Sequence, residues 1–233
     1  MIYVLYYYSY WLLIPAFLFA LWAQSRVKST YARYSKEFAS LTGAEAARMV
    51  LEMNGVTGVA IEQVAGELTD HFDPKTNTIR LSKGVYDVTS VAAVGIAAHE
   101  AGHAVQYAVG YSPIKLRTAI IPVTQIGSTL SWPLLLIGLA LGSELLATAG
   151  VVLFCAVVLF QLVTLPVEFN ASNRALDTLG ASGYLQEEQL NGAGKVLRAA
   201  AMTYVAALAQ ALAQLLRLLM IANRGNRGHY RRH

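Results

Sequence analysis

Charged side chains are scarce in this sequence of 233 residues. Asp, Glu, Lys and Arg make up only 14% of it, whereas a typical soluble domain has about 25%. Hydrophobic residues account for 55% of the chain, and the mean hydropathy is +0.44. Because the uncharged residues are gathered into long runs, the composition indicates an integral membrane protein rather than an apolar soluble one.

Cysteine is almost absent, since Cys155 is the single one and it lies inside an apolar run. A lone cysteine excludes an intramolecular disulfide, and it also excludes a zinc site built from cysteine thiolates. Any metal site in this chain must therefore use His, Asp or Glu side chains.

The sequence also lacks a basic patch interleaved with aromatic residues, although its net charge is +4. Its basic residues lie mainly beside apolar segments, where lipid head groups and membrane topology account for them. We therefore expect membrane lipid, and no nucleic acid, around this protein; its oligomeric state is not indicated.

Residues 1–22 predict a transmembrane anchor, because no charge interrupts residues 2–22 and this length can cross about 30 Å of hydrocarbon. A cleavable signal peptide is the alternative. A signal peptide has basic residues at its start, whereas here Arg26 and Lys28 follow the apolar segment. We therefore interpret it as a retained anchor with its N-terminus outside.

Two further apolar runs, residues 118–141 and 145–167, carry no charge and are separated by a short loop. They predict a transmembrane hairpin over residues 118–167. Residues 199–222 form a fourth helix that either spans the membrane or lies in its interface. A basic tail, residues 223–233, ends the chain.

The distribution of Lys and Arg predicts the orientation. Such residues occur in segments 23–117 and 168–198, and none occurs in the loop 142–144. Because basic loops stay on the cytoplasmic side, we expect 23–117 and 168–198 in the cytoplasm of a bacterium and the loop outside its cytoplasmic membrane. A fully spanning fourth helix would put the basic tail outside, against this rule, so whether it spans stays open.

Residues 23–117 have the pattern of a small α+β region. Thr42 and Glu45 form a capping box that begins a helix over 44–53. Residues 59–64 resemble a strand, Asp73 begins a turn over 73–77, and residues 78–81 return as a second strand of a small β-hairpin. A second helix follows over 90–109. The expected fold class is a mainly α integral membrane protein with a zincin-like α+β catalytic region and three to four transmembrane helices.

The chemical signal lies in this second helix, as His99-Glu100-Ala101-Gly102-His103. Residues four apart share a helix face, so both imidazoles can reach one metal ion. Zinc in catalytic sites takes two imidazoles and a carboxylate and leaves one position open. Glu100 can then act as the general base toward a zinc-activated water. The alternative is two unrelated histidines that bond within the core.

A third ligand must come from elsewhere. Glu168 is the first choice, because it directly follows the second arm of the hairpin on the same side of the membrane as the motif, and a carboxylate there is costly unless it is paired or metal-bound. A solvated interfacial Glu is the alternative. His71 is the second choice of ligand and Asp177 the third, while Glu144 lies in the opposite loop.

Three residues are candidates for supporting a ligand or contacting the substrate: His71, Asp73 and Arg174. The first two lie in Asp70-His71-Phe72-Asp73, just before the strand that precedes the motif helix. In zinc peptidases such a strand commonly forms the edge of the cleft and pairs with an extended substrate. Arg174 could orient a carboxylate or stabilise an oxyanion. A polar turn and a surface arginine are the respective alternatives.

Three segments together resemble a known bacterial family. They are Asp70-His71-Phe72-Asp73-Pro74, the segment 97–104 around the motif, and Pro166-Val167-Glu168-Phe169-Asn170-Ala171-Ser172. In this order, after an apolar anchor, they resemble the YugP-type neutral zinc metallopeptidases over nearly the whole chain. More distantly they resemble the HtpX-type membrane peptidases, which place a transmembrane hairpin between the histidine pair and a Glu ligand.

The resemblance implies that Glu168 is the third zinc ligand. The HtpX-type segment commonly carries an Asp four residues later, where this chain has Ser172. We therefore expect a membrane-bound zinc metalloendopeptidase that hydrolyses polypeptides, with Zn²⁺ as cofactor. A non-enzymatic, metal-stabilised membrane scaffold that binds partners is the alternative function.

Overall fold

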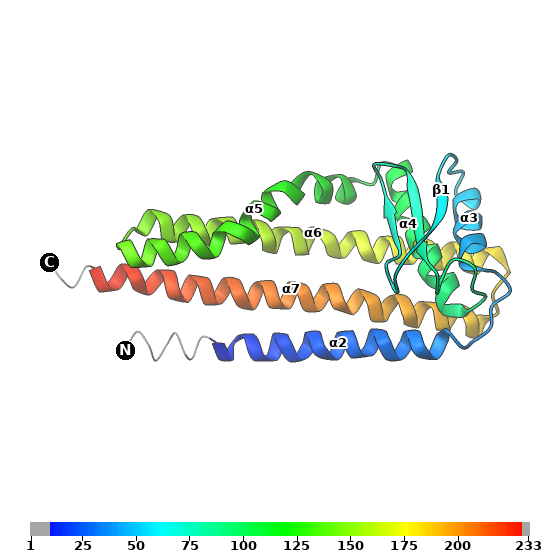
Figure 1. Cartoon of the computed structure of the whole chain (residues 1–233), viewed down its shortest axis with the longest axis horizontal. Helices are drawn as coiled ribbons and strands as arrows, with labels where there is room; N and C mark the ends of the chain where they lie inside the picture. Colours follow the sequence, from blue (N-terminus) through cyan, green and yellow to red (C-terminus); the bar gives the residue numbers. More distant parts are fainter. Residues whose placement is uncertain (1–9, 230–233) are drawn as a thin grey trace. The chain divides into compact units, whose positions relative to one another are not determined.

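A computed structural model describes residues 10–229, and side chains as far as residue 222. The predicted anchor therefore lies partly outside the described residues, as do the side chains of the basic tail. The helices and strands are α2 (Leu13–Tyr34), α3 (Gly43–Met53), β1 (Ala60–Val64), β2 (His71–Asp73), β3 (Thr78–Ser82), α4 (Val91–Ala108), α5 (Ser112–Leu141), α6 (Glu144–Ser182) and α7 (Glu187–His229) (Figure 1).

The chain divides into two compact units, each made of segments distant in sequence. The site unit comprises residues 23–115 and 166–202, and the helical unit comprises residues up to 22, 116–165 and from 203 onward. Helices α2, α5, α6 and α7 each contribute residues to both.

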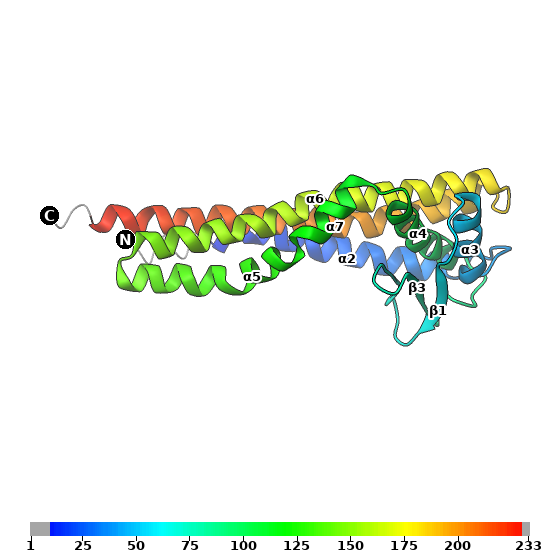
Figure 2. The same ribbon diagram turned by 90° about the horizontal axis from the view of Figure 1, so that it is seen from above.

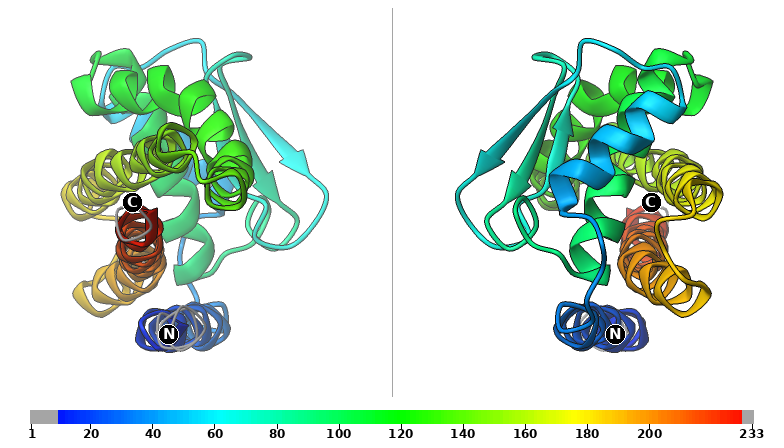
Figure 3. Two further views of the ribbon diagram at one scale, coloured as in Figure 1. Left: turned by 90° about the vertical axis from the view of Figure 1, so that its left-hand side faces the viewer. Right: turned by 90° about the vertical axis from the view of Figure 1, so that its right-hand side faces the viewer.

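The site unit packs a small sheet and α3 against the buried helix α4, as Figure 3 shows for the sheet. Its core joins α3, β3 and α4 to the adjoining parts of α6 and α7, through residues such as Val50, Ile79, Val94, Leu179 and Val196. Helix α4 is buried along most of its length, and its sequence is rich in alanine and glycine. Small side chains let neighbouring helices approach its backbone closely.

The sheet has the order β1-β3-β2, which corrects the expected hairpin. Strand β1 runs parallel to β3, whereas β2 pairs antiparallel with it. The hairpin is therefore β2–β3, and β3 lies in the centre instead of at the cleft edge. The sequence did not reveal β2 because three residues are too few for a periodic pattern.

Both helices predicted around the motif region are confirmed with small changes in their bounds. The Thr42–Glu45 capping box begins α3, with Thr42 Oγ1 accepting from the Glu45 amide at 3.2 Å and Glu45 accepting from the Thr42 amide at 2.8 Å. Ser90 caps α4 by its side chain alone, with Oγ accepting from the Ala93 amide at 3.2 Å. These caps fix where each helix begins.

In the helical unit, α5 and α6 form the predicted helical hairpin, and Figure 2 shows it beside α7. The two helices come into close contact where a glycine of one lies against the backbone of the other. A Cβ on Gly150 of α6 would lie 2.6 Å from the Ser131 carbonyl oxygen of α5, and a Cβ on Gly138 of α5 would lie 2.4 Å from the Ala147 amide nitrogen of α6. Helices α6 and α7 are longer than expected, because α6 continues to Ser182 and α7 already begins at Glu187.

Three helices among the described residues are long and apolar enough to cross a membrane: Ser112–Leu141, Glu144–Ser182 and Glu187–Ala222. Fewer than a third of the residues in their most apolar windows are buried inside the structure. The apolar side chains that remain exposed on these helices are not covered by the described part of the chain, and apolar surface of this extent is typical of contact with lipid or another protein.

Candidate metal and catalytic site

Helix α4 presents the two motif histidines on one face. The ring centroids of His99 and His103 are 4.7 Å apart, and the two planes are nearly perpendicular at 79°. His103 is buried, and His99 is partly exposed. One helical turn separates them, so their Nε2 atoms point toward the same place, as the spacing predicts.

Glu168 on α6 meets both imidazoles. One carboxylate oxygen, Oε2, lies 3.3 Å from His99 Nε2 and 3.5 Å from His103 Nε2. The Glu168 side chain is only 3% exposed. Among the described residues these three form the group whose ligand atoms could hold a metal, with all of those atoms within 4.8 Å of one another.

The donor set fits zinc. Two imidazole nitrogens and one carboxylate oxygen are the protein ligands of a catalytic zinc site, and the fourth position is left for water or substrate. A buried carboxylate that faces two nitrogens is also costly to maintain unless a cation or proton lies between them.

Gly102 explains how α6 comes this close to α4. A Cβ at this position would lie 2.5 Å from the carbonyl oxygen of Ala171 and 3.2 Å from its carbonyl carbon. These are backbone atoms of a helix, which cannot rotate away as a side chain can. The glycine between the motif residues therefore determines the helix separation, and with it the reach of Glu168 toward the histidines.

Electrostatics around His103 favour a cation. Burial alone would lower the pKa of His103, but its hydrogen bond with Glu168 and the negative charges of Glu100 and Glu168 outweigh burial and raise the pKa above its ordinary value. The same arrangement that attracts a proton attracts a metal ion, which competes with that proton for the ligand atoms.

Each histidine also has a partner on its other ring nitrogen. His103 Nδ1 lies 3.1 Å from Gln106 Oε1, and His99 Nδ1 lies 3.1 Å from Ser172 Oγ. Such contacts orient metal-binding imidazoles. Ser172 thus supplies a hydroxyl where the HtpX-type pattern has a carboxylate. The sequence analysis did not find Gln106, although its position three residues after His103 places it on the same helix face.

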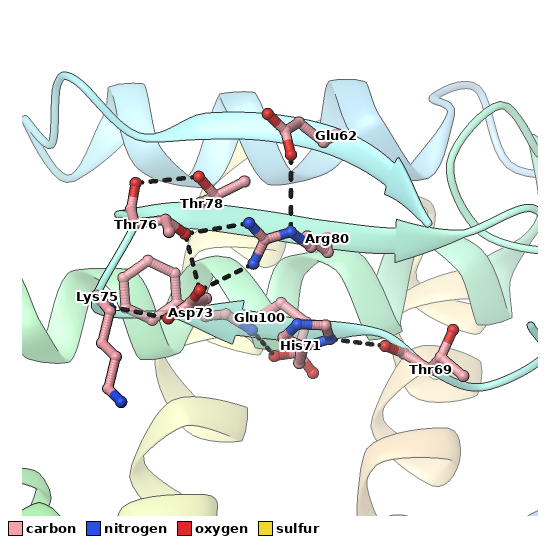
Figure 4. Close-up of polar contacts among 10 residues, drawn as sticks. Glu62, Thr69, His71, Asp73, Lys75, Thr76, Thr78, Arg80 and Glu100 are labelled. Carbon is pink, nitrogen blue, oxygen red and sulfur yellow. Dashed lines mark hydrogen bonds and ion pairs between the residues drawn. The ribbon is translucent and has the colours of Figure 1, made fainter. Parts of the chain in front are cut away.

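Glu100 lies at the edge of the sheet. Its Oε2 accepts a hydrogen bond from the backbone amide of Phe72 in β2 at 3.0 Å (Figure 4). Strand β2 ends the sheet in the described structure, so its outer side borders the catalytic motif. The Phe72 ring lies 5.5 Å from that of Tyr107. Phe72 is a site residue that sequence reasoning did not single out.

Asp73 on β2, and Asp70 directly before it, form hydrogen bonds within the sheet region. Asp70 accepts from the Ser82 amide at 2.7 Å. Asp73 accepts from Arg80 at 3.0 Å, and Arg80 also pairs with Glu62 on β1 (Figure 4). Hydrogen bonds from Arg80 and from the Thr76 hydroxyl hold the pKa of Asp73 well below its usual range, at about 2.

His71 has an exposed side chain whose Nδ1 contacts the Thr69 carbonyl oxygen at 2.8 Å, and it is not in the metal-ligand group. Asp177 is exposed and also outside that group. Arg174 is half-buried and donates through Nε to Asn170 Oδ1 at 2.9 Å. The structure therefore brings together the first-choice ligands and leaves the two alternatives apart.

A helical His-Glu-x-x-His sequence joined to a buried carboxylate on a second helix is a ligand pattern typical of zinc-dependent peptidases. The chain belongs to the family described as "Putative neutral zinc metallopeptidase", whose model matches residues 9–223. Membership in this family identifies zinc as the metal, and it implies polypeptides as the substrate class.

A curated relative supports this assignment over almost the same length. The chain is 47% identical over 212 residues to the "Putative membrane protease YugP" of Bacillus subtilis (strain 168), covering 90% of this chain and 94% of that protein. No solved structure matches the chain.

Proposed function

We propose that this protein is a membrane-bound zinc endopeptidase in which His99, His103 and Glu168 hold the metal. One observation carries the proposal: a single buried Glu168 oxygen lies within 3.5 Å of the Nε2 atoms of both histidines. When bound, zinc would lower the pKa of a water molecule to about 7 and polarise a carbonyl group.

Glu100 is the proposed general base. It adjoins His99 in the motif, is partly exposed, and is held through one carboxylate oxygen by the Phe72 amide. Its other oxygen remains to take a proton from the attacking water and to deliver it to the leaving amine. One carboxylate that accepts the proton and returns it to the leaving amine balances the proton transfers of amide hydrolysis.

We further propose that the substrate lies as an extended peptide along β2. The central strand β3 has neighbours on both sides, whereas β2 ends the sheet within the described residues. An extended peptide can add to such an edge by main-chain hydrogen bonds, and here it would pass beside Glu100. The proposed cleft edge is therefore β2, because β3, the strand expected in this role, lies in the centre of the sheet.

The surface of the helical unit supports a proposed insertion in the membrane. Its described helices expose large apolar side chains such as Leu136, Val152 and Leu162, and three helices have the length and composition of membrane spans. We propose that these surfaces contact lipid in the bacterial cytoplasmic membrane, with the zinc site on the cytoplasmic side as the Lys and Arg distribution predicts.

Metal content and cleavage together test this function. Purified wild-type protein should contain about one zinc per chain, since one donor set is present, whereas His103→Ala and Glu168→Ala should lose it. Asp177→Ala removes an exposed carboxylate from the same helix and should keep the metal. Equal zinc in all four proteins would contradict the proposed ligand set.

Glu100→Gln separates the enzyme from a metal-stabilised scaffold. The amide keeps the shape of the side chain and can still contact the Phe72 amide region, but it cannot act as a base. We expect normal zinc content and loss of cleavage of an unfolded protein substrate by about 100-fold or more. Full complementation of a deletion strain by this variant would favour the scaffold.

Orientation can be tested with single cysteines in a Cys155→Ala background. Ser143→Cys in the α5–α6 loop should react with a membrane-impermeant thiol reagent in intact cells, and Lys36→Cys should react only after lysis. The reverse pattern would place the zinc site outside.

A further inference from the structure

Gln106 is completely buried beside the metal-ligand group, and all of its side-chain hydrogen-bonding groups have partners. Its Oε1 lies 3.1 Å from His103 Nδ1. Its Nε2 lies 2.8 Å from the Val167 carbonyl oxygen and 3.0 Å from Asn170 Oδ1. An amide nitrogen has two hydrogens, so both are used by α6 while the oxygen faces α4.

The orientation of this amide is determined by the backbone. The Val167 carbonyl oxygen can only accept a hydrogen bond, so the Gln106 atom that faces it must be the NH₂ group. The oxygen of Gln106 must then face His103. An exchange of nitrogen and oxygen would oppose two acceptors at Val167 and leave buried groups unsatisfied, which is costly.

The tautomer of His103 follows from this orientation. Because Gln106 Oε1 is an acceptor, His103 Nδ1 must carry the hydrogen, and the Nε2 lone pair of the neutral ring is left facing Glu168. That is the tautomer a metal requires. His99 differs, because the Ser172 hydroxyl on its Nδ1 can either donate or accept and so does not impose a tautomer.

The chain of contacts ends at a charged group. Asn170 Oδ1 accepts from both Gln106 Nε2 and Arg174 Nε, at 3.0 and 2.9 Å. A guanidinium can only donate, so Arg174 fixes the amide of Asn170 just as Val167 fixes that of Gln106. The order Arg174, Asn170, Gln106, His103 is therefore consistent in donors and acceptors along its whole length.

We propose that Gln106 is a positioning residue that holds His103 in its metal-binding tautomer and ties α4 to the segment of α6 that carries Glu168. This inference rests on the proposed function, since it assigns Gln106 a role toward the same metal. It also gives Arg174 a role as the outer anchor of this chain of contacts, distinct from the oxyanion or carboxylate role expected from the sequence.

Two substitutions of Gln106 distinguish the effect of its hydrogen-bond acceptor from the effect of its side-chain volume. Gln106→Leu has a similar size but no polar atom, and we expect zinc affinity to fall about 10- to 100-fold. Gln106→Glu keeps an acceptor for His103 in either protonation state, and its protonated form can also donate to Val167. Gln106→Glu should therefore recover most of the affinity that Gln106→Leu loses. Gln63→Leu, on an exposed part of β1, is the matched control and should behave as wild type.

The measurement uses the full chain purified in detergent. Zinc affinity is determined by competition with a chelating dye, and thermal unfolding of the metal-free proteins shows whether each variant folds. Imidazole ¹⁵N NMR of the metal-free protein, assigned with His103→Ala and recorded at alkaline pH where the ring is neutral, reports the tautomer directly. We expect His103 protonated at Nδ1 in wild type and Gln106→Glu, and a mixture in Gln106→Leu.

The outcomes distinguish this inference from the proposed function. If wild-type protein binds no zinc, the proposed function fails. If wild type binds zinc and Gln106→Leu matches it in affinity and tautomer, only the role of Gln106 is refuted. If Gln106→Leu does not fold, Gln106→Glu decides, because an affinity reduced 10-fold or more in a folded Gln106→Glu protein would also overturn the inference.

Discussion

Replacing Gly102 by alanine is a severe test of the site, because it adds one methyl group and removes no ligand. The new Cβ would lie 2.5 Å from the Ala171 carbonyl oxygen and within 3.3 Å of two further backbone atoms. Ordinary contact begins at 3.4 Å, so α4 and α6 must separate by 3.4 − 2.5 = 0.9 Å at this point, or one of them must deform.

Two effects oppose each other in this variant. Alanine is the better helix former by about 1 kcal/mol, whereas forcing a methyl group into a packed interface costs about 1–3 kcal/mol. We therefore expect only a small change in overall stability. Metal ligation is less tolerant, because ligand distances are set within about 0.2 Å, and Glu168 lies less than one turn before Ala171 on α6.

Zinc affinity is therefore the informative quantity. We expect Gly102→Ala to lower it at least as much as loss of a ligand-orienting contact does, about 10- to 100-fold, with a smaller change in the thermal midpoint of the metal-free protein. Gly95→Ala is the control on the same helix, because its Cβ would meet the Ala193 Cβ of α7 at 3.3 Å and requires only a slight adjustment there, and its nearest neighbouring atoms belong to α7 rather than α6.

The assay is competition with a chelating dye, together with zinc determination by mass spectrometry on the purified chain. If Gly102→Ala binds zinc as tightly as Gly95→Ala and wild type, the helix separation does not control the site. The reasoning that derives Glu168 ligation from close packing at Gly102 would then be refuted.

Three further predictions address the surroundings of the site. Phe72→Pro removes the amide hydrogen that Glu100 accepts, on an edge strand where proline is tolerated, and it also removes the ring beside Tyr107; Phe72→Ala removes the ring alone and is the control. Relative to Phe72→Ala, kcat/KM of Phe72→Pro should fall about 10- to 100-fold with zinc retained, since a hydrogen bond to a charged group contributes about 1.5–3 kcal/mol. Equal kcat/KM in the two variants would argue against a positioning role of the amide. Ser172→Ala removes the hydroxyl that contacts His99 Nδ1 and should weaken zinc binding about 10-fold, measured by competition with a chelating dye. Unaltered zinc affinity would show that this contact does not support the ligand. The pKa of Asp73 is lowered to about 2, chiefly by its hydrogen bond with Arg80. The contribution of the Asp73 carboxylate to stability is therefore present above the ordinary carboxyl pKa and is lost as the pH falls toward 2. The thermal midpoints of wild type and Asp73→Asn should differ at pH 6 and converge near pH 2, and a constant difference would contradict this linkage.

The sequence was sufficient for features encoded locally. The capping box at Thr42, the helix that carries His99 and His103, and the hairpin of the uncharged runs 118–141 and 145–167 all follow from patterns within one or two turns or one apolar run. Glu168 could be nominated because it directly follows an apolar run, where an unpaired carboxylate is costly. Its proximity to the histidines required the structure.

Features that depend on distant partners could not be predicted. Strand β2 is three residues long and is defined by its pairing with β3, so no periodicity reveals it. Helix α6 continues past Pro166 and Glu168 to Ser182, although the change from apolar to polar residues suggested a boundary. Polarity changes the surroundings of a helix but does not end it. One proline removes a backbone hydrogen bond and crowds the preceding turn, which a long helix packed in a bundle tolerates.

The seam between α4 and α6 shows most clearly why the site is hard to infer from periodicity. His99, Gly102, His103 and Gln106 occupy positions i, i+3, i+4 and i+7, the spacing at which an ordinary helix places its apolar core side chains. Here that stripe contains no large apolar residue, so a pattern search would assign it to solvent. The structure instead buries most of it against α6, with glycine setting the distance between the helices and glutamine setting the orientation of an imidazole. A buried polar stripe is costly unless its groups are satisfied, and the atoms that satisfy this one come from the helix segment that contains Glu168. The sequence features that weaken hydrophobic packing at this seam are therefore the ones that assemble the metal ligands.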